Sequence, residues 1–196
     1  MSSPNVGVLA LQGAFREHIR LFDSLGVSAR GVRTPEDLIG LDALTIPGGE
    51  STTISRLAAD LGVLEPVTQL VKAGLPTFGT CAGMIMLADE VFDGRNDQQS
   101  FGGLQITVRR NAFGRQTESF EAPVSMPILG DSPFPGVFIR APWVEQVGEE
   151  VEVWGQIERP EGSRIVAVRQ GPVVATAFHP ELADDDRLHR KFLSLI

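Results

Sequence analysis

The chain has 196 residues, enough for one domain with a sizeable core, and 42% of them are hydrophobic while 21% are charged. The net charge of −8, with no long run of like charge, argues against nucleic-acid binding through phosphate neutralisation. A single cysteine excludes an internal disulfide, and the lack of a secretory leader or a long apolar run argues against export and against a membrane protein, so we expect a cytoplasmic protein.

The first half of the chain alternates short apolar runs with amphipathic segments. The apolar runs predict strands at residues 6–11, 27–32, 43–46 and 75–78. Helical spacing of apolar residues predicts helices at 14–25, 54–61, 65–72 and 84–91, and the run Thr34-Pro35-Glu36-Asp37 is typical of a helix start. This alternation predicts a parallel sheet with helices on both faces.

The second half of the chain is richer in strands. After a polar loop at 92–103, strands are predicted at 104–109, 120–126, 137–139, 151–157, 164–168 and 173–178, and a helix at 184–196. No linker or repeat interrupts the sequence, so we expect a single domain over residues 1–196. The expected fold is a three-layer α/β open sheet, mostly parallel, with antiparallel additions.

The segment Gly79-Thr80-Cys81-Ala82-Gly83 holds the only cysteine, between a predicted strand and a predicted helix. Glycine on both sides allows neighbouring backbone to pass close to a sharp turn, the geometry of the nucleophile elbow of serine hydrolases. A cysteine there lies at a helix N-terminus, which favours the thiolate. A lone cysteine is more often a small buried hydrophobic residue, but the flanking glycines favour a nucleophile.

A thiolate nucleophile needs a base and a group that orients the base. His179 follows a predicted strand, and Pro180 fixes the bend that places Glu181 within reach of its imidazole, as in a catalytic triad. His18 and His189 fall among charged residues of predicted helices, and we expect both to be solvated.

Attack on an amide also needs donors for the developing oxyanion. The Gly48-Gly49 pair after a predicted strand could present the Gly49 N–H, and the Ala82 N–H follows the nucleophile. The segments Gln12-Gly13 and Gly48-Gly49-Glu50 and the residue Cys81 all follow strand ends, so a parallel sheet would bring them to one edge.

Three segments, in this order, resemble those of a class I (triad) glutamine amidotransferase: Pro47-Gly48-Gly49-Glu50-Ser51-Thr52, Phe78-Gly79-Thr80-Cys81-Ala82-Gly83 and Phe178-His179-Pro180-Glu181-Leu182. Further segments resemble the glutaminase subunit of pyridoxal 5′-phosphate synthase: Val8-Leu9-Ala10-Leu11-Gln12-Gly13 with Arg16-Glu17-His18, Arg110-Asn111-Ala112-Phe113-Gly114-Arg115-Gln116, Ser119-Phe120-Glu121 and Gly136-Val137-Phe138-Ile139-Arg140-Ala141-Pro142. The resemblance covers essentially the whole chain and implies a flavodoxin-like fold of the class I amidotransferase type.

The resemblance implies that Cys81 attacks L-glutamine, that a glutamyl thioester forms, and that His179, held by Glu181, transfers protons. It also implies that ammonia passes to a separate pyridoxal 5′-phosphate synthase subunit, and that the chain itself uses no cofactor or metal. The positions that match glutamine-binding residues are Gly49, Glu50, Ser51, Arg110, Ile139 and Arg140. An arginine fork suits the α-carboxylate of glutamine, and a carboxylate such as that of Glu50 suits its ammonium group.

Two other functions share this fold. A cysteine peptidase or another thiol hydrolase would use the same elbow, and release of ammonia from glutamine rather than from peptides separates these enzymes. A non-catalytic binding module would be free to lose Cys81, His179 or Glu181, and the intact set argues against it. We also expect the peptide at Gly49 to switch orientation when the synthase subunit docks, because glycine accepts both signs of φ.

Overall fold

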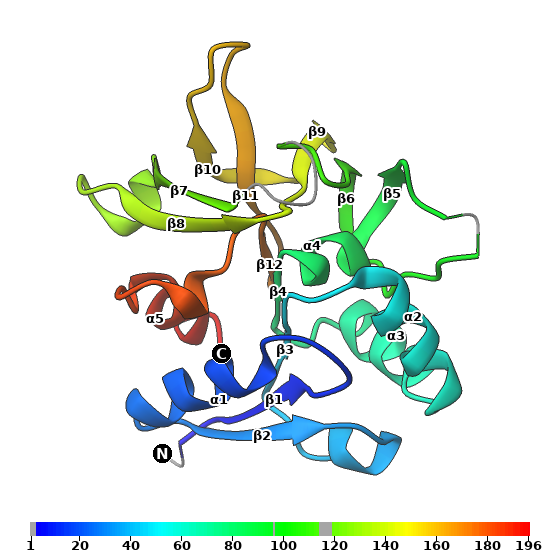
Figure 1. Ribbon diagram of the computed structural model, residues 1–196. Helices are drawn as coiled ribbons and strands as arrows, with labels where there is room; N and C mark the ends of the chain where they lie inside the picture. Colours follow the sequence, from blue (N-terminus) through cyan, green and yellow to red (C-terminus); the bar gives the residue numbers. More distant parts are fainter. Residues whose placement is uncertain (1–2, 96, 114–118) are drawn as a thin grey trace.

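The computed structural model describes residues 3–95, 97–113 and 119–196, and a large sheet runs through its centre (Figure 1). The strand order is β2-β1-β3-β4-β12-β11-β9-β6-β5, and β10 pairs with β11. The strands are β1 (Asn5–Leu9), β2 (Ser28–Val32), β3 (Ala43–Ile46), β4 (Thr77–Thr80), β5 (Ala88–Phe92), β6 (Leu104–Arg109), β9 (Trp143–Val147), β10 (Glu152–Ile157), β11 (Arg164–Gln170) and β12 (Val173–Thr176).

The strands β2, β1, β3, β4 and β12 pair in parallel, and β11, β9 and β10 add antiparallel pairs. Every residue of β3, β4 and β12 is buried, as expected for strands covered on both faces. This arrangement confirms the α/β sheet that the alternating sequence predicts.

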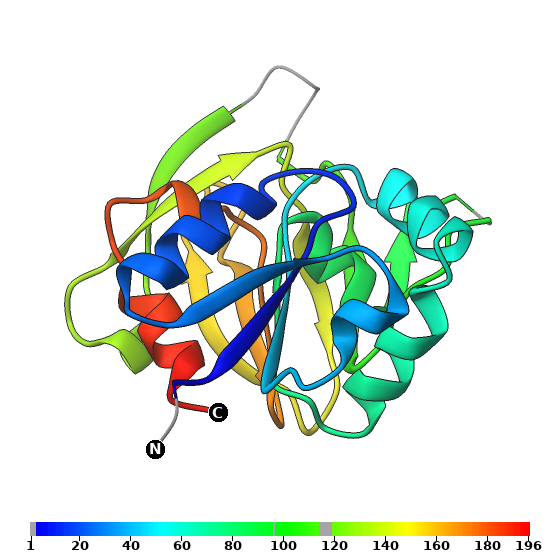
Figure 2. The same cartoon turned by 90° about the horizontal axis from the view of Figure 1, so that it is seen from below.

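Helices cover both faces of the sheet. Figures 1 and 2 show α1 and α5 on one face and α2 and α3 on the other. The helices are α1 (Phe15–Ser24), α2 (Ser51–Asp60), α3 (Leu64–Lys72), α4 (Ala82–Leu87) and α5 (Arg187–Leu193), with 3₁₀ turns η1 (Pro35–Leu38), η2 (Pro127–Leu129) and η3 (Pro180–Leu182). None of the helices in the described ranges is long and apolar enough to cross a membrane.

A separate two-stranded sheet joins β7 (Ser119–Val124) to β8 (Phe134–Ile139) in antiparallel register. A β-bridge between Ser125 and Gln156 joins the segment after β7 to strand β10 of the main sheet. Phe120 and Phe138 stack across the pair with ring centroids 4.7 Å apart. Strand β8 also contacts the segment after β12, because the Val137 carbonyl accepts a 2.8 Å hydrogen bond from the His179 N–H.

Three local predictions were wrong. The helix expected at 84–91 ends at Leu87, and its last residues form β5, which pairs in parallel with β6. The helix expected after Thr34 is only the turn η1, although Thr34 and Asp37 do form a capping box. The strand β9 was not predicted. It is stabilised by pairing with β6 and β11, and no local sequence pattern indicates that pairing.

Candidate active site

Four adjacent parallel strands, β1, β3, β4 and β12, deliver their C-terminal ends to one edge of the sheet. The segments that follow them begin at Ala10, Pro47, Cys81 and Ala177. Strand β12 lies beside β4 with Thr176 opposite Thr80. The register therefore places the cysteine segment and the histidine segment next to each other.

Cys81 occupies a strained turn between β4 and α4, with φ of +49° and ψ of −103°. Its N–H donates to the Thr176 carbonyl at 2.8 Å, which ties the turn to the neighbouring strand. A Cβ on Gly83 would lie 2.0 Å from the Ile46 carbonyl oxygen, and one on Gly79 would lie 2.7 Å from the Gly83 carbonyl oxygen. Both flanking glycines are therefore needed for the close approach that the sequence predicted.

His179 and Glu181 form a tight buried pair. Nδ1 of His179 lies 2.7 Å from Oε1 of Glu181, and the Glu181 side chain is fully buried. Pro180 begins the turn η3 between them, and the His179 N–H is held by the Val137 carbonyl. A single turn thus aims the imidazole and supplies its acidic partner.

In this pair, the carboxylate of Glu181 stabilises the charged imidazolium of His179, and the imidazolium stabilises the carboxylate. Burial alone would lower the pKa of His179, but its hydrogen bonds to Cys81 and Glu181 raise that pKa to about 10. Burial opposes ionisation of Glu181, yet interactions with His18 and His179 hold the pKa of Glu181 well below its usual range. The imidazole of His179 is therefore protonated near neutral pH, beside an ionised carboxylate.

Backbone and side-chain hydrogen bonds hold the Pro47–Glu50 loop. The Gly48 N–H donates to Thr80 Oγ1 at 3.0 Å, and the Gly48 carbonyl accepts from the Ala14 N–H at 3.0 Å. The Glu50 N–H donates to Gln12 Oε1 at 2.7 Å. The segment after β1 therefore fixes the loop that sequence analysis proposed for the oxyanion.

A cavity of about 380 Å³ lies over this edge of the sheet. It is lined by Gln12, Gly13, Ala14, Gly48, Gly49, Glu50, Ser51, Cys81, Ile85, Arg110, Asn111, Ile139, Arg140, His179 and Leu182. The six residues predicted to bind glutamine all line it, together with Cys81 and His179. Glu181 lies behind His179, and Ala82 begins α4; neither lines the cavity.

The Cys81 thiol faces the end of β8, where Sγ lies 3.8 Å from the Ile139 carbonyl oxygen. Arg140 follows with φ of +48°, and the next peptide is anchored by a hydrogen bond from the Ala112 N–H to the Ala141 carbonyl. Strand β8 and the segment after β6 therefore form the wall of the cavity opposite the sheet edge.

The Glu50 carboxylate caps helix α2. It accepts hydrogen bonds from the backbone N–H and the hydroxyl of both Thr52 and Thr53, and its Oε1 pairs with Arg110 Nη2 at 3.1 Å. Burial opposes its charge, but the bonds from Thr52 and Thr53 lower the pKa of Glu50 to about 2. This capping role of Glu50 was not predicted from the sequence, and it leaves the carboxylate with few free lone pairs.

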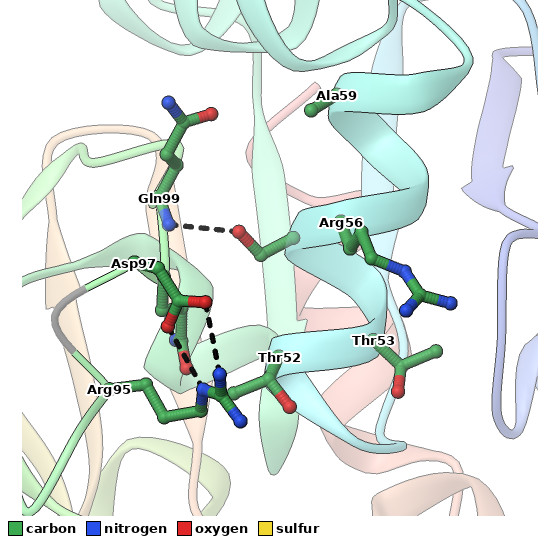
Figure 3. A pocket seen from close by; sticks show the side chains of 9 residues that line it. Thr52, Thr53, Arg56, Ala59, Arg95, Asp97 and Gln99 are labelled. Carbon is green, nitrogen blue, oxygen red and sulfur yellow. Dashed lines mark hydrogen bonds and ion pairs between the residues drawn. The ribbon is translucent and has the colours of Figure 1, made fainter.

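A second cavity, of about 420 Å³, runs along α2 and is drawn in Figure 3. Thr52 on α2 lies beside Arg95, which pairs with Asp97, whereas the Arg56 side chain points to the other side of the helix. Gln99 donates its N–H to Ser55 Oγ. The residues that line it include no cysteine or histidine. Within the described ranges, no group of three or more His, Cys, Asp or Glu side chains is arranged to hold a metal ion.

A family model for the SNO glutamine amidotransferase family matches residues 8–196. The chain belongs to the SNO glutamine amidotransferase family. The matched range includes every residue of the candidate site.

Curated relatives of this SNO-family chain cover its full length. It is 57% identical to the pyridoxal 5′-phosphate synthase subunit PdxT of Salinispora tropica, over 100% of this chain and 98% of the relative. It is 53% identical to the protein of the same name from Streptomyces coelicolor, over 99% of this chain and 94% of the relative. A solved structure described as a glutamine amidotransferase superposes with a TM-score of 0.87 at 51% identity, covering 97% of each chain.

The prediction that His18 and His189 are solvated is wrong for this family member. Both side chains are fully buried, on the faces of α1 and α5 that pack against the sheet. His18 shares its face with Phe22, one helical turn later, while the charged neighbours that suggested exposure occupy the other face.

Two polar residues of this site, Thr80 and Gln98, and the contact of His18 with Glu181 were not predicted from the sequence. Gln98 Oε1 accepts from Ser51 Oγ at 3.3 Å and lies 3.5 Å from Arg110 Nη1. No motif marks Gln98, which lies in a polar loop. The residues Gly114, Arg115 and Gln116, which contribute to the family resemblance, lie outside the described ranges.

Proposed function

We propose that this chain is the glutaminase subunit of a cytoplasmic pyridoxal 5′-phosphate synthase, and that residues 1–196 act as one glutaminase domain. It would hydrolyse L-glutamine to L-glutamate and ammonia, and deliver the ammonia to a separate synthase subunit. The observation that carries the proposal is the strained Cys81 turn, set beside the 2.7 Å pair of His179 and Glu181 at the floor of a cavity.

In the proposed mechanism, the Cys81 thiolate attacks the side-chain carbonyl carbon of glutamine. The tetrahedral intermediate collapses with cleavage of the C–N bond, and the His179 imidazolium donates the proton with which ammonia leaves. Water, deprotonated by the same imidazole, then attacks the thioester and releases glutamate and the thiol. Glu181 keeps the imidazole oriented and stabilises its charge through both steps.

The developing oxyanion would be met by the backbone N–H groups of Gly49 and Ala82. Ala82 follows the nucleophile directly, and Gly49 lies in the loop that Thr80, Ala14 and Gln12 anchor. An oxyanion donor typically contributes about 10²- to 10³-fold to turnover.

For substrate recognition, we assign the α-carboxylate of glutamine to Arg110 and Arg140, and the ammonium group to Glu50. Glu50 already pairs with Arg110 at 3.1 Å. The substrate ammonium group would replace the Arg110 guanidinium beside Glu50, and the guanidinium would then pair with the substrate carboxylate. Ser51, the Gly49 backbone and the Ile139 carbonyl complete the polar lining of the cavity.

The test is ammonia release from glutamine by the full chain, with and without the synthase subunit, with short peptides as the competing substrates. The proposal expects release from glutamine, stimulated by the synthase subunit through the peptide at Gly49. Hydrolysis of peptides but not of glutamine would indicate the thiol hydrolase instead. An unstimulated, fully active isolated chain would remove the reason for a switch at Gly49.

A further inference from the structure

A buried histidine pair lies behind the candidate triad, outside the cavity. His18 on α1 and His189 on α5 are both 0% exposed, and neither lines the cavity that holds Cys81. Burying imidazoles carries a free-energy cost unless their nitrogens find partners. The positions of those partners indicate what the pair does.

The two rings connect to Glu181 in series. Nε2 of His189 lies 3.1 Å from Nδ1 of His18. Nε2 of His18 lies 3.3 Å from Oε2 of Glu181, the carboxylate oxygen that does not face His179, and 3.2 Å from Thr80 Oγ1. Oε2 of Glu181 accepts no well-aligned hydrogen bond from any described residue. The imidazole of His18 is the polar group recorded beside it.

The unpartnered nitrogen of His189 decides which atoms carry protons. Among the described residues, Nδ1 of His189 has no hydrogen-bond partner, and burial lowers the pKa of His189 well below its usual range. His189 is therefore neutral. Because an orphaned buried N–H is rarer than an orphaned acceptor, its proton lies on Nε2 and is donated to Nδ1 of His18. His18 must then carry its own proton on Nε2.

This protonated nitrogen lies 3.3 Å from Oε2, the oxygen of the candidate triad acid that does not face His179. We propose that His18 is a positioning residue that holds Glu181 against His179, with His189 fixing the tautomer of His18. The inference rests on the proposed function, because it concerns the same candidate triad. Without His18, the fully buried Glu181 carboxylate would lose the ring nitrogen that lies 3.3 Å from Oε2, and it could turn away from His179.

The same N–H also reaches the loop proposed for the oxyanion. Thr80 Oγ1, at 3.2 Å from His18, accepts the Gly48 N–H at 3.0 Å. One residue of α1 therefore contacts both the acid of the triad and the anchor of the Gly48 loop. This position explains why a polar ring, rather than another apolar side chain, occupies the buried face of α1.

The test compares His18→Gln with His18→Leu in the full chain, assayed with the synthase subunit. Gln keeps an N–H near the place of Nε2, whereas Leu removes it. We expect His18→Leu to lower kcat on the order of 10- to 100-fold, with KM within about two-fold of wild type, and His18→Gln to recover part of the loss. The alkaline limb of kcat should move to lower pH in His18→Leu, because a displaced Glu181 no longer raises the pKa of His179 as strongly.

A matched control is Phe22→Leu, one turn along the same buried face of α1. It should lower the melting temperature without moving the pH profile. A measurement that needs no variant is ¹⁵N NMR of histidine-labelled wild-type chain, which should find His18 protonated on Nε2.

The inference is overturned if His18 carries its proton on Nδ1, or if both His18 variants keep the wild-type kcat and pH profile per folded molecule. Labelling of wild-type Cys81 by a chloroketone analogue of glutamine separates this failure from failure of the proposed function. If wild type is labelled and active while the His18 variants match it, only the positioning role is lost. If wild type is neither labelled nor active on glutamine, the proposed function itself fails.

Discussion

A Cβ on Gly48 would lie 2.2 Å from Cε1 of His179. The loop after β3 and the imidazole after β12 are thus in direct contact, although 131 residues separate them in the sequence numbering (179 − 48). Only glycine leaves room for the imidazole at its observed position.

Gly48→Ala should therefore displace His179 and cut kcat by about 10²-fold, since an error of about 1 Å in a catalytic group has effects of that size. The matched control is Gly31→Ala, where the added Cβ would meet only the Ala10 Cβ at 3.1 Å. Steady-state glutaminase assays on both variants check the prediction. Equal activity in the two would show that the imidazole has room to move.

The pH dependence of activity should report the coupling between His179 and Glu181. Because the pKa of His179 is raised to about 10, its protonated form persists through the neutral range and is lost as the pH rises through about 10. Glu181→Gln removes one of the two interactions that raise this pKa, so the alkaline limb of kcat should shift to lower pH.

The same variant should lower turnover by up to about 10⁴-fold, the loss seen when the orienting acid of a serine triad is replaced. Far-ultraviolet circular dichroism serves as the check that the fold survives. If Glu181→Gln keeps the wild-type kcat, Glu181 serves only to form the turn and does not orient His179.

Cys81→Ser should abolish ammonia release, because a hydroxyl is poorly activated at this site. The change is nearly isosteric in a residue that is 5% exposed, so the melting temperature should stay within a few degrees of wild type. Mass spectrometry after reaction with the glutamine chloroketone should locate the adduct on Cys81. An adduct on any other residue, or residual activity in the serine variant, contradicts the nucleophile assignment.

Arg110→Ala should raise KM for glutamine more than it lowers kcat, because it removes a charged contact with the substrate carboxylate. The loss of binding should be roughly 1.5–3 kcal/mol, typical of a hydrogen bond to a charged group. Arg56→Ala, in the neighbouring cavity along α2, is the control and should leave KM unchanged. An effect on kcat alone would assign Arg110 to the structure of the Glu50 cap.

Glu50→Gln should destabilise the fold by about 1 kcal/mol through its weaker helix cap. Since the folded-state pKa of Glu50 is lowered from 4.5 to about 2, its charge stabilises the fold above pH 4.5, and this contribution is lost as the pH falls toward 2. Solvent screening keeps the effect small, because the side chain is 40% exposed.

Urea denaturation of wild type and Glu50→Gln between pH 2 and pH 6 measures this contribution. The two stability curves should converge at the acidic end, whereas Glu158→Gln in an exposed loop should run parallel to wild type throughout. Curves that stay separated at pH 2 would exclude the cap charge as the cause.

The local sequence determined the turns that carry the candidate catalytic residues. Gly79 and Gly83, two residues before and after Cys81, predict the elbow. Only a residue without a side chain allows the close contacts found at these two positions. The spacing His179-Pro180-Glu181 predicts the hydrogen-bonded pair of His179 and Glu181, because the proline fixes a short turn between the two side chains. The alternation of strands and helices also predicted that these turns meet at one edge of the sheet, because each turn follows a strand and parallel strands share a direction.

Tertiary structure alone decided the surroundings of those turns. Charged neighbours suggested that His18 and His189 face solvent, but packing of α1 and α5 on the sheet buries both, and their contact joins positions 171 residues apart. The same holds for the hydrogen bond that ties Gly48 to Thr80, and for β9, which depends on partner strands. Periodicity and motif spacing report only on the few residues along one turn or strand, whereas burial and pairing depend on which distant segments the folded chain brings together.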